Sequence, residues 1–115
     1  MPISIPMPTK SIPTKITFFE WLLPLVISGK KIITIRDEAE SHYVPGTIVE
    51  VSALETGKFA CFIKILSVAP LAFDEISEFH AEQECLPLDK LKTLISDIYP
   101  NIEKLYVINF ELVND

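Results

Sequence analysis

Residues 29–38 read GKKIITIRDE, a run of β-branched residues with cations at both ends and a hydroxyl within it. Isoleucine and threonine favour a β-strand. Lys31 and Arg36 on either side of Thr34 are unusual in a buried strand, because buried cations need partners. A simpler interpretation is an edge strand whose basic ends protect it from pairing with another chain. This stretch therefore predicts either a protected strand edge or polar chemistry built into a strand.

The segments around this stretch predict an α+β domain. Upstream we expect a helix over 18–28 that is capped by Thr17 and Glu20, kinked or shortened by Pro24 and ended by Gly29. Downstream we expect strands over 32–36, 48–54, 59–68 and 104–112, and helices over 74–84 and 88–98. Helices and strands do not alternate regularly in this order, so we expect a small curled β-barrel flanked by about three helices.

Composition limits the classes of function. The 115 residues suit one domain, which we place at 16–115, after a proline-rich extended tail at 1–15. The net charge of −6 disfavours long nucleic acids as partners. Cys61 and Cys85 lack the paired spacing of a zinc site, and no segment resembles a signal peptide or a membrane span. We therefore expect a soluble cytoplasmic monomer without metal or cofactor.

Lys31 and Thr34 could act together in hydrolysis. A neutral lysine amine can remove a threonine proton, and the resulting alkoxide can attack an acyl carbon. Residues three apart point to opposite faces of a flat strand, so this cooperation requires Lys31 to lie in the turn after Gly29. Burial and nearby cations lower the pKa of a lysine, whereas the negative end of a helix raises it. The residues alone leave the balance open.

Two histidines are the other candidates for chemistry. His80 belongs to the segment His-Ala-Glu-Gln-Glu at 80–84, which more often forms a solvated helix end than a site and lacks the His-Glu-x-x-His zinc spacing. His42 stands alone and is more often a structural hydrogen-bonding residue. The aromatic side chains are most simply part of the core, although one could stack on a base.

Several blocks in one order resemble a known family. They are Ile16–Phe19, Gly29–Lys31 leading into Ile33–Glu38, Glu40–His42, His80–Glu84 and Asp97–Pro100. Over residues 16 to about 111 the chain resembles the small ASCH-domain proteins of the N4-acetylcytidine amidohydrolase family, within the PUA-like superfamily. The resemblance implies a small β-barrel flanked by helices. It also implies hydrolysis of the acetyl amide on acetylated cytidine to give cytidine and acetate.

The resemblance also assigns roles to individual residues. The family's proton acceptor corresponds to Lys31, its nucleophile to Thr34 and its proton donor to Glu84. Arg36, Asp37 and Glu38 are candidates for substrate binding, with a small acylated cytosine nucleoside as the partner. A dry pocket would favour a neutral Lys31 and a protonated Glu84, whereas direct pairing would do the reverse, so we expect bound substrate to separate them.

The chain departs from the family pattern at two positions. The family commonly has threonine where this chain has Ile32, which could alter substrate fit, and its first helix usually lacks a proline such as Pro24.

Two alternatives to an active hydrolase are open. One alternative is an RNA-binding module without hydrolytic activity, because PUA-like domains often bind RNA. The other is a folded domain that has lost activity.

Overall fold

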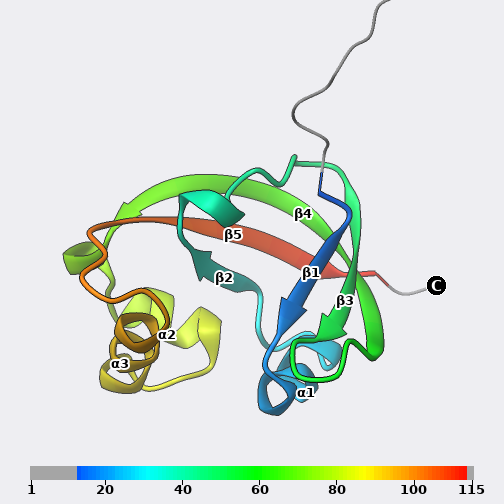
Figure 1. Cartoon of the computed structure of the whole chain (residues 1–115), viewed down its shortest axis with the longest axis horizontal. Coiled ribbons are helices and arrows are strands. Elements are labelled where there is room, and N and C mark those ends of the chain that lie inside the picture. Colours follow the sequence, from blue (N-terminus) through cyan, green and yellow to red (C-terminus); the bar gives the residue numbers. More distant parts are fainter. Residues whose placement is uncertain (1–12, 114–115) are drawn as a thin grey trace, which may run out of the picture.

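The computed structural model describes residues 13–113, whose strands form one five-stranded sheet in the order β1-β3-β4-β5-β2 (Figure 1). The strands are β1 (Lys15–Phe18), β2 (Ile33–Arg36), β3 (Ile48–Ala53), β4 (Phe59–Ala72) and β5 (Lys104–Leu112). β1 runs parallel to β3, and the other neighbouring strands are antiparallel. The predicted α+β class and curled sheet are confirmed. The word barrel is too strong, because β1 and β2 remain the two edges of the sheet.

Three helices cover the concave side of this sheet. They are α1 (Leu23–Ile27), which follows the 3₁₀ turn η1 (Glu20–Leu22), and α2 (Glu78–Glu84) and α3 (Leu88–Ile98). Two further 3₁₀ turns, η2 (Glu38–Glu40) and η3 (Phe73–Glu75), follow β2 and β4. Figure 1 shows α1 under one end of the sheet and α2 with α3 under the other, with β2 between them.

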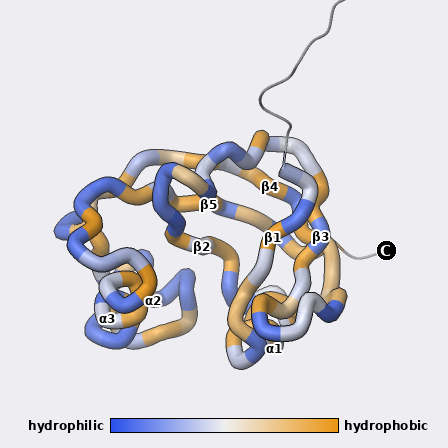
Figure 2. The backbone as a smooth tube through the Cα atoms, in the orientation of Figure 1, coloured by the Kyte–Doolittle hydropathy of each residue, from blue (hydrophilic) through white to orange (hydrophobic). Residues whose placement is uncertain are grey.

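The core is divided into two clusters by this arrangement. The first joins Val26 of α1 to Val49 and Val51 of β3 and to neighbouring side chains of β1, β4 and β5. The second joins Leu91 and Ile95 of α3 to side chains of β2 and β5, to Ala81 of α2 and to Ile76 just before α2. Figure 2 shows the corresponding hydrophobic stretches along β2, β4 and β5. Each fully buried aliphatic side chain contributes about 1.5–3 kcal/mol, and the space between the clusters is left for polar groups.

The start of the domain differs from the prediction of a helix over 18–28. Ile16 and Phe18 alternate into the core as part of β1, so Thr17 lies in a strand and cannot cap a helix. The Glu55 carboxylate accepts the Glu20 backbone N–H at 2.9 and 3.1 Å, which supplies from the β3–β4 turn the acceptor expected from Thr17. Pro24 lies in the first turn of α1, where a missing N–H leaves no hydrogen bond unmade, so it causes no kink.

Two other boundaries also differ. β4 continues through Pro70 to Ala72, because β3 pairs with it only as far as Lys64 and the remaining part has one neighbour. The helix predicted over 74–84 begins only at Glu78, with Ser77 as its N-cap. The expected tail at residues 1–15 lies outside the described residues over 1–12, and β1 begins at Lys15. No helix in the described part of the chain is long and apolar enough to cross a membrane.

Candidate active site

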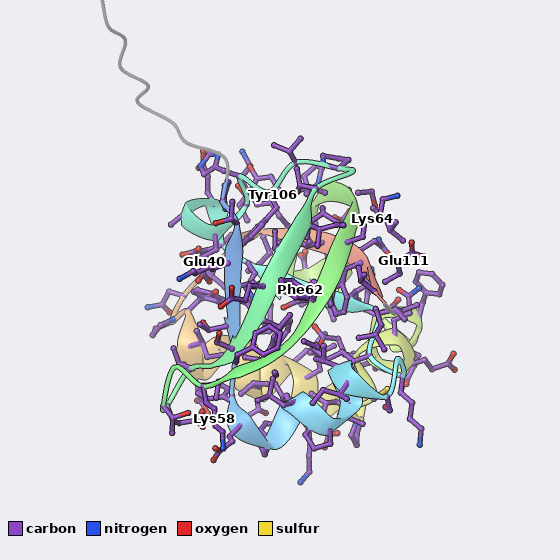
Figure 3. All side chains as sticks on the ribbon, turned by 90° about the vertical axis from the view of Figure 1, so that its right-hand side faces the viewer. Glu40, Lys58, Phe62, Lys64, Tyr106 and Glu111 are labelled. Atoms are coloured by element: carbon purple, nitrogen blue, oxygen red, sulfur yellow. The ribbon has the colours of Figure 1, made fainter. Side chains whose placement is uncertain are left out.

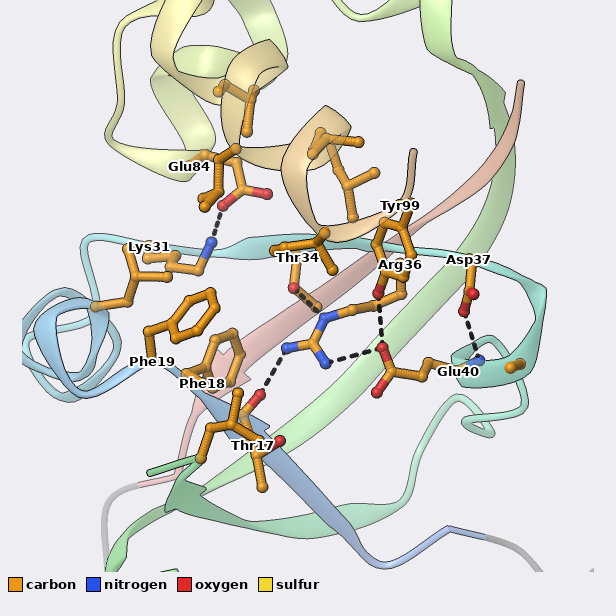
Figure 4. Close-up of a pocket in the computed structure, with 18 residues that line it drawn as sticks. Thr17, Phe18, Phe19, Lys31, Thr34, Arg36, Asp37, Glu40, Glu84 and Tyr99 are labelled. Atoms are coloured by element: carbon orange, nitrogen blue, oxygen red, sulfur yellow. Dashed lines mark hydrogen bonds and ion pairs between the residues drawn. The ribbon is translucent and has the colours of Figure 1, made fainter. Parts of the chain in front are cut away.

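A cavity of about 400 Å³ lies where the two core clusters meet (Figure 4). Apolar side chains from β1, η1 and α3 form much of its wall, including Phe18, Leu22 and Leu91. Its polar lining comes from segments far apart in the sequence: Thr17, Lys31, Thr34, Arg36, Asp37, Glu40, Glu84 and Tyr99. A cavity of this size falls in the range of small-molecule sites, about 300–1,000 Å³.

Lys31 lies in the turn between α1 and β2, as predicted. Gly29 ends the helix with φ +80°, a left-handed conformation that glycine adopts without strain. The backbone N–H groups of Lys30 and Lys31 then both donate to Leu25 O, at 3.1 and 3.0 Å. This tight turn directs the Lys31 side chain into the cavity, where it is only 2 % exposed.

Lys31 forms a buried ion pair with Glu84, the last residue of α2. Both side chains are almost inaccessible to solvent. Burial, and after it the positive charge of Arg36, lower the pKa of Lys31 to about 7 against a smaller opposing effect of Cys85. Contact with the Glu84 carboxylate favours the charged amine, so burial and the ion pair act on Lys31 in opposite directions.

Thr34 is held by a different cation. Its side chain is 4 % exposed, and its Oγ1 accepts a hydrogen bond of 2.8 Å from Arg36 Nε. Residues two apart in a strand share a face, so β2 itself places these two side chains together. Because the hydroxyl accepts from Arg36, its own proton is left to be donated elsewhere. Thr34 is thus oriented by a neighbour that can also stabilise an alkoxide.

The Arg36 guanidinium has partners on three sides. Besides Thr34, it donates from Nη2 to the backbone oxygen of Thr17 at 2.8 Å and from Nη1 to Glu40 Oε1 at 3.4 Å. The Thr17 bond joins β2 to β1, so one side chain spans the two edges of the open sheet. The Phe18 ring lies 5.0 Å from this guanidinium and 5.7 Å from Lys31 Nζ. Both cations thus face the same aromatic ring.

Five of the six residues singled out from the sequence line this cavity. Lys31, Thr34, Glu84, Arg36 and Asp37 are brought together, whereas Glu38 is exposed and does not line it. The sequence placed Lys31, Thr34 and Glu84 in one pocket, and within that pocket the structure pairs Lys31 with Glu84 and Thr34 with Arg36. The cause is that β2 sets the Thr34–Arg36 contact locally, while α2 brings Glu84 to the turn.

Glu40 and Tyr99 are cavity residues that the sequence did not single out for chemistry. Tyr99 OH donates to Glu40 Oε1 at 2.7 Å. Both occur in the blocks that carried the family resemblance, which is the only signal that could have identified them. Asp37 caps η2 by accepting the Glu40 backbone N–H at 3.3 Å.

The two histidines lie outside this cavity lining. His80 Nδ1 accepts the Ser77 backbone N–H at 3.1 Å, so it caps α2. His42 is exposed. Among residues 13–113, no group of three or more histidine, cysteine, aspartate or glutamate side chains is arranged to hold a metal ion.

Known proteins resemble this chain in both sequence and fold. It is 69 % identical over 101 residues to the N(4)-acetylcytidine amidohydrolase of Vibrio campbellii, covering 88 % of this chain and 95 % of that protein. Its identity to the Vibrio cholerae protein of the same name is 67 % over 102 residues, covering 89 % and 97 %. The crystal structure of an ASCH domain from Lactobacillus crispatus superposes with a TM-score of 0.65 at 16 % identity, covering 86 % of this chain and 79 % of that one.

The similarity to the ASCH-domain crystal structure establishes the fold, and the similarity to the two Vibrio sequences establishes the family. A scan against models of protein families finds no match. Identity of two thirds over nearly the whole length of both chains leaves no doubt about descent. The chain belongs to the family of N(4)-acetylcytidine amidohydrolases.

Proposed function

We propose that this protein hydrolyses the acetyl amide on the exocyclic nitrogen of N4-acetylcytidine, releasing cytidine and acetate. The observation that carries the proposal is the presence of Lys31, Thr34 and Glu84 in one small cavity of a chain that belongs to this family. We take the substrate from the relatives, which are named N(4)-acetylcytidine amidohydrolases. The cavity supplies a nucleophile, a base and an acid with no metal required by the chemistry.

Activation of the nucleophile begins with the Lys31–Glu84 pair. When the shared proton rests on Glu84, Lys31 is a neutral amine that can accept the Thr34 proton. A lysine whose pKa is lowered to about 7 reaches this state at neutral pH at little cost. Arg36 Nε, already 2.8 Å from Thr34 Oγ1, stabilises the negative charge that develops on that oxygen.

In the acyl-transfer step the Thr34 proton moves to Lys31, and the Glu84 proton leaves with the cytosine amine. Thr34 Oγ1 bonds to the acetyl carbon, the bond from that carbon to the cytosine amine breaks, and Glu84 protonates the departing nitrogen. Water next attacks the acetyl ester on Thr34 and gives one proton to Glu84. Lys31 returns its proton to Thr34 Oγ1 as the ester bond breaks, and the acetic acid released ionises to acetate by giving its proton to water. Two short steps with a positioned acid and base thus replace one direct attack on a stable amide.

The remaining cavity groups orient the nucleoside. The larger apolar side chains around the cavity suit the flat pyrimidine and the acetyl methyl, among them Phe18, Phe19, Leu22, Leu91 and Ile95. Arg36 acts through Thr34, and the Asp37 oxygen that does not cap η2 is available to a substrate hydroxyl. We leave Glu38 out of the binding set because it lies outside the cavity lining.

The test is direct. Purified protein is incubated with N4-acetylcytidine, and cytidine release is followed chromatographically for wild type, Lys31→Ala and Thr34→Ala. Lys30→Ala is the matched control, because Lys30 is the exposed neighbour of Lys31. We expect turnover by wild type and the control, with loss in the other two. Absence of turnover in wild type, or unchanged turnover in Thr34→Ala, would contradict the proposal.

A further inference from the structure

Glu40 and Tyr99 have no part in the chemistry of Lys31, Thr34 and Glu84, yet they line the same cavity. They come from separate elements, Glu40 from η2 and Tyr99 from the C-terminal end of α3. The Tyr99 hydroxyl donates to Glu40 Oε1 at 2.7 Å across 59 residues of sequence. This hydrogen bond between parts of the chain far apart in sequence holds the Glu40 carboxylate in one position.

Glu40 Oε1 accepts hydrogen bonds from both Tyr99 and Arg36. Arg36 Nη1 donates to Glu40 Oε1 at 3.4 Å, and Arg36 Nη2 donates to Thr17 O at 2.8 Å. A guanidinium is planar and rigid, so fixing its two outer nitrogens also fixes the direction of its Nε–H. That third donor meets Thr34 Oγ1 at 2.8 Å. Figure 4 shows the resulting path from Tyr99 through Glu40 and Arg36 to Thr34.

We infer that Glu40 and Tyr99 are positioning residues, which hold the Arg36 guanidinium so that its Nε–H stays directed at Thr34 Oγ1. The inference rests on the proposed function, because Thr34 has a nucleophile's role only there. Neither residue needs to touch the substrate. Their effect reaches the reaction through the orientation of Arg36.

Exposure explains why Tyr99 is needed. The Arg36 and Glu40 side chains are 12 % and 43 % exposed, so water competes for this ion pair and the carboxylate could turn outward. The Tyr99 hydroxyl anchors the carboxylate on the cavity side. Burial, followed by the hydrogen bond to Glu40, raises the pKa of Tyr99 well above its usual range, so the phenol keeps the proton it donates.

Positioning matters because the threonine hydroxyl can rotate. With Arg36 Nε as donor, one lone pair of Thr34 Oγ1 is occupied and the hydroxyl proton is directed away from the guanidinium. If Arg36 swings aside, the oxygen loses both its orientation and the positive charge that favours its alkoxide. Misplacement of this kind lowers the rate of the chemical step rather than the affinity for substrate.

The experiment compares Tyr99→Phe, Glu40→Ala and the double variant with wild type. We expect Tyr99→Phe to lower kcat about five-fold, the effect of about one hydrogen bond, with KM changed less than about two-fold. In the Glu40→Ala background the same substitution should have almost no further effect, because the two residues act in series. Glu111→Gln and Glu111→Ala, on the strand β5 and away from the cavity lining, are the controls (Figure 3).

A second readout does not depend on activity. Solvent exchange of the Arg36 Nε–H, followed by ¹⁵N NMR, should quicken in Tyr99→Phe and Glu40→Ala and stay unchanged in the controls. Wild type without turnover would contradict the proposed function, and quickened exchange would still support the positioning role. Wild-type exchange in both variants would overturn the inference. So would a rise in KM at unchanged kcat, which would place Glu40 in contact with substrate.

Discussion

The two ends of the cavity hold similar ion pairs in opposite environments. At one end the side chains of Lys31 and Glu84 are 2 % and 6 % exposed. At the other end those of Arg36 and Glu40 are 12 % and 43 % exposed. The first pair lies between the two core clusters, and the second meets solvent where β2 passes into η2.

In the mechanism we propose, this difference separates acid–base chemistry from positioning. Burial lowers the pKa of Lys31 to about 7, which makes its proton available at neutral pH. A guanidinium keeps its proton in proteins and offers a rigid set of donors. Contact with an opposite charge therefore does not by itself make a residue an acid or a base. Removal of the side chain from water shifts its pKa, and the residue type decides whether the proton can leave.

The largest effect is expected where the two ends meet, at Thr34. Thr34→Ala removes the proposed nucleophile and should lower kcat about 10⁴-fold. Thr34→Ser keeps the hydroxyl that Arg36 contacts, so it should retain much of the activity. Steady-state hydrolysis of N4-acetylcytidine measures both. Equal loss in the two variants would indicate that the methyl group, rather than the hydroxyl, is what the site requires.

The buried pair can be broken or replaced. Lys31→Met should lower kcat about 10³-fold, because the base is lost. It should also cost about 3–5 kcal/mol of unfolding free energy, because Glu84 is left as a buried charge without its partner. Urea denaturation and activity are measured on the same samples.

The double variant Lys31→Met with Glu84→Leu separates the two effects of that substitution. Two apolar side chains of similar size remove the uncompensated charge, so most of the stability should return while activity stays lost. A double variant as unstable as the single one would mean that the pair stabilises the fold in a way that packing cannot replace.

The pH dependence should report the buried end alone. Because Lys31 must be neutral, kcat/KM should fall about tenfold per pH unit below about 7.

The change of folding stability with pH also has a definite sign. The lowered pKa of Lys31, taken alone, makes stability rise with pH between about 7 and 10.5, because the unfolded chain there binds a proton that the folded amine has lost. Transfer of that proton to Glu84 rather than to solvent would cancel the rise, so the measurement distinguishes the two. Lys31→Met should lack that rise in denaturation curves at pH 7 and 9.

The exposed end should respond more weakly. In Arg36→Lys the positive charge remains, but one ammonium cannot reach both Thr34 Oγ1 and Thr17 O. We expect kcat to fall about tenfold, with a smaller change in KM. Activity equal to wild type would show that charge alone suffices there, and the contrast between the two ends would then rest on burial only.

The smallest effect is expected at Ile32, next to the buried pair in sequence. Its side chain is 37 % exposed and does not line the cavity, although its backbone N–H donates to Gln83 O at 3.1 Å. Ile32→Thr, which restores the residue common in the family, should change unfolding free energy by about 0.5 kcal/mol or less. Turnover should be unchanged. A clear gain in turnover would show that the cavity extends beyond its described lining.

Sequence patterns anticipated the elements that depend on local signals. Gly29 marked the end of α1, the apolar spacing marked α3, and the β-branched run marked β2. The simpler interpretation of residues 29–38 was also correct in part, since β2 is an edge strand. β1 was missed because Thr17 and Glu20 imitate a capping box. Its strand conformation depends on pairing with β3, which no local pattern encodes.

The residue types of the site were likewise readable, whereas their partners were not. Turn chemistry and strand periodicity are local properties, so residues 29–36 alone place a lysine in a tight turn before a strand that carries Thr34 and Arg36 on one face. The pairing of Lys31 with Glu84, and the link from Tyr99 through Glu40 to Arg36, could not be read from local patterns. Those contacts arise from the packing of α2 and α3 against β2, which also buries the lysine and lowers its pKa to about 7.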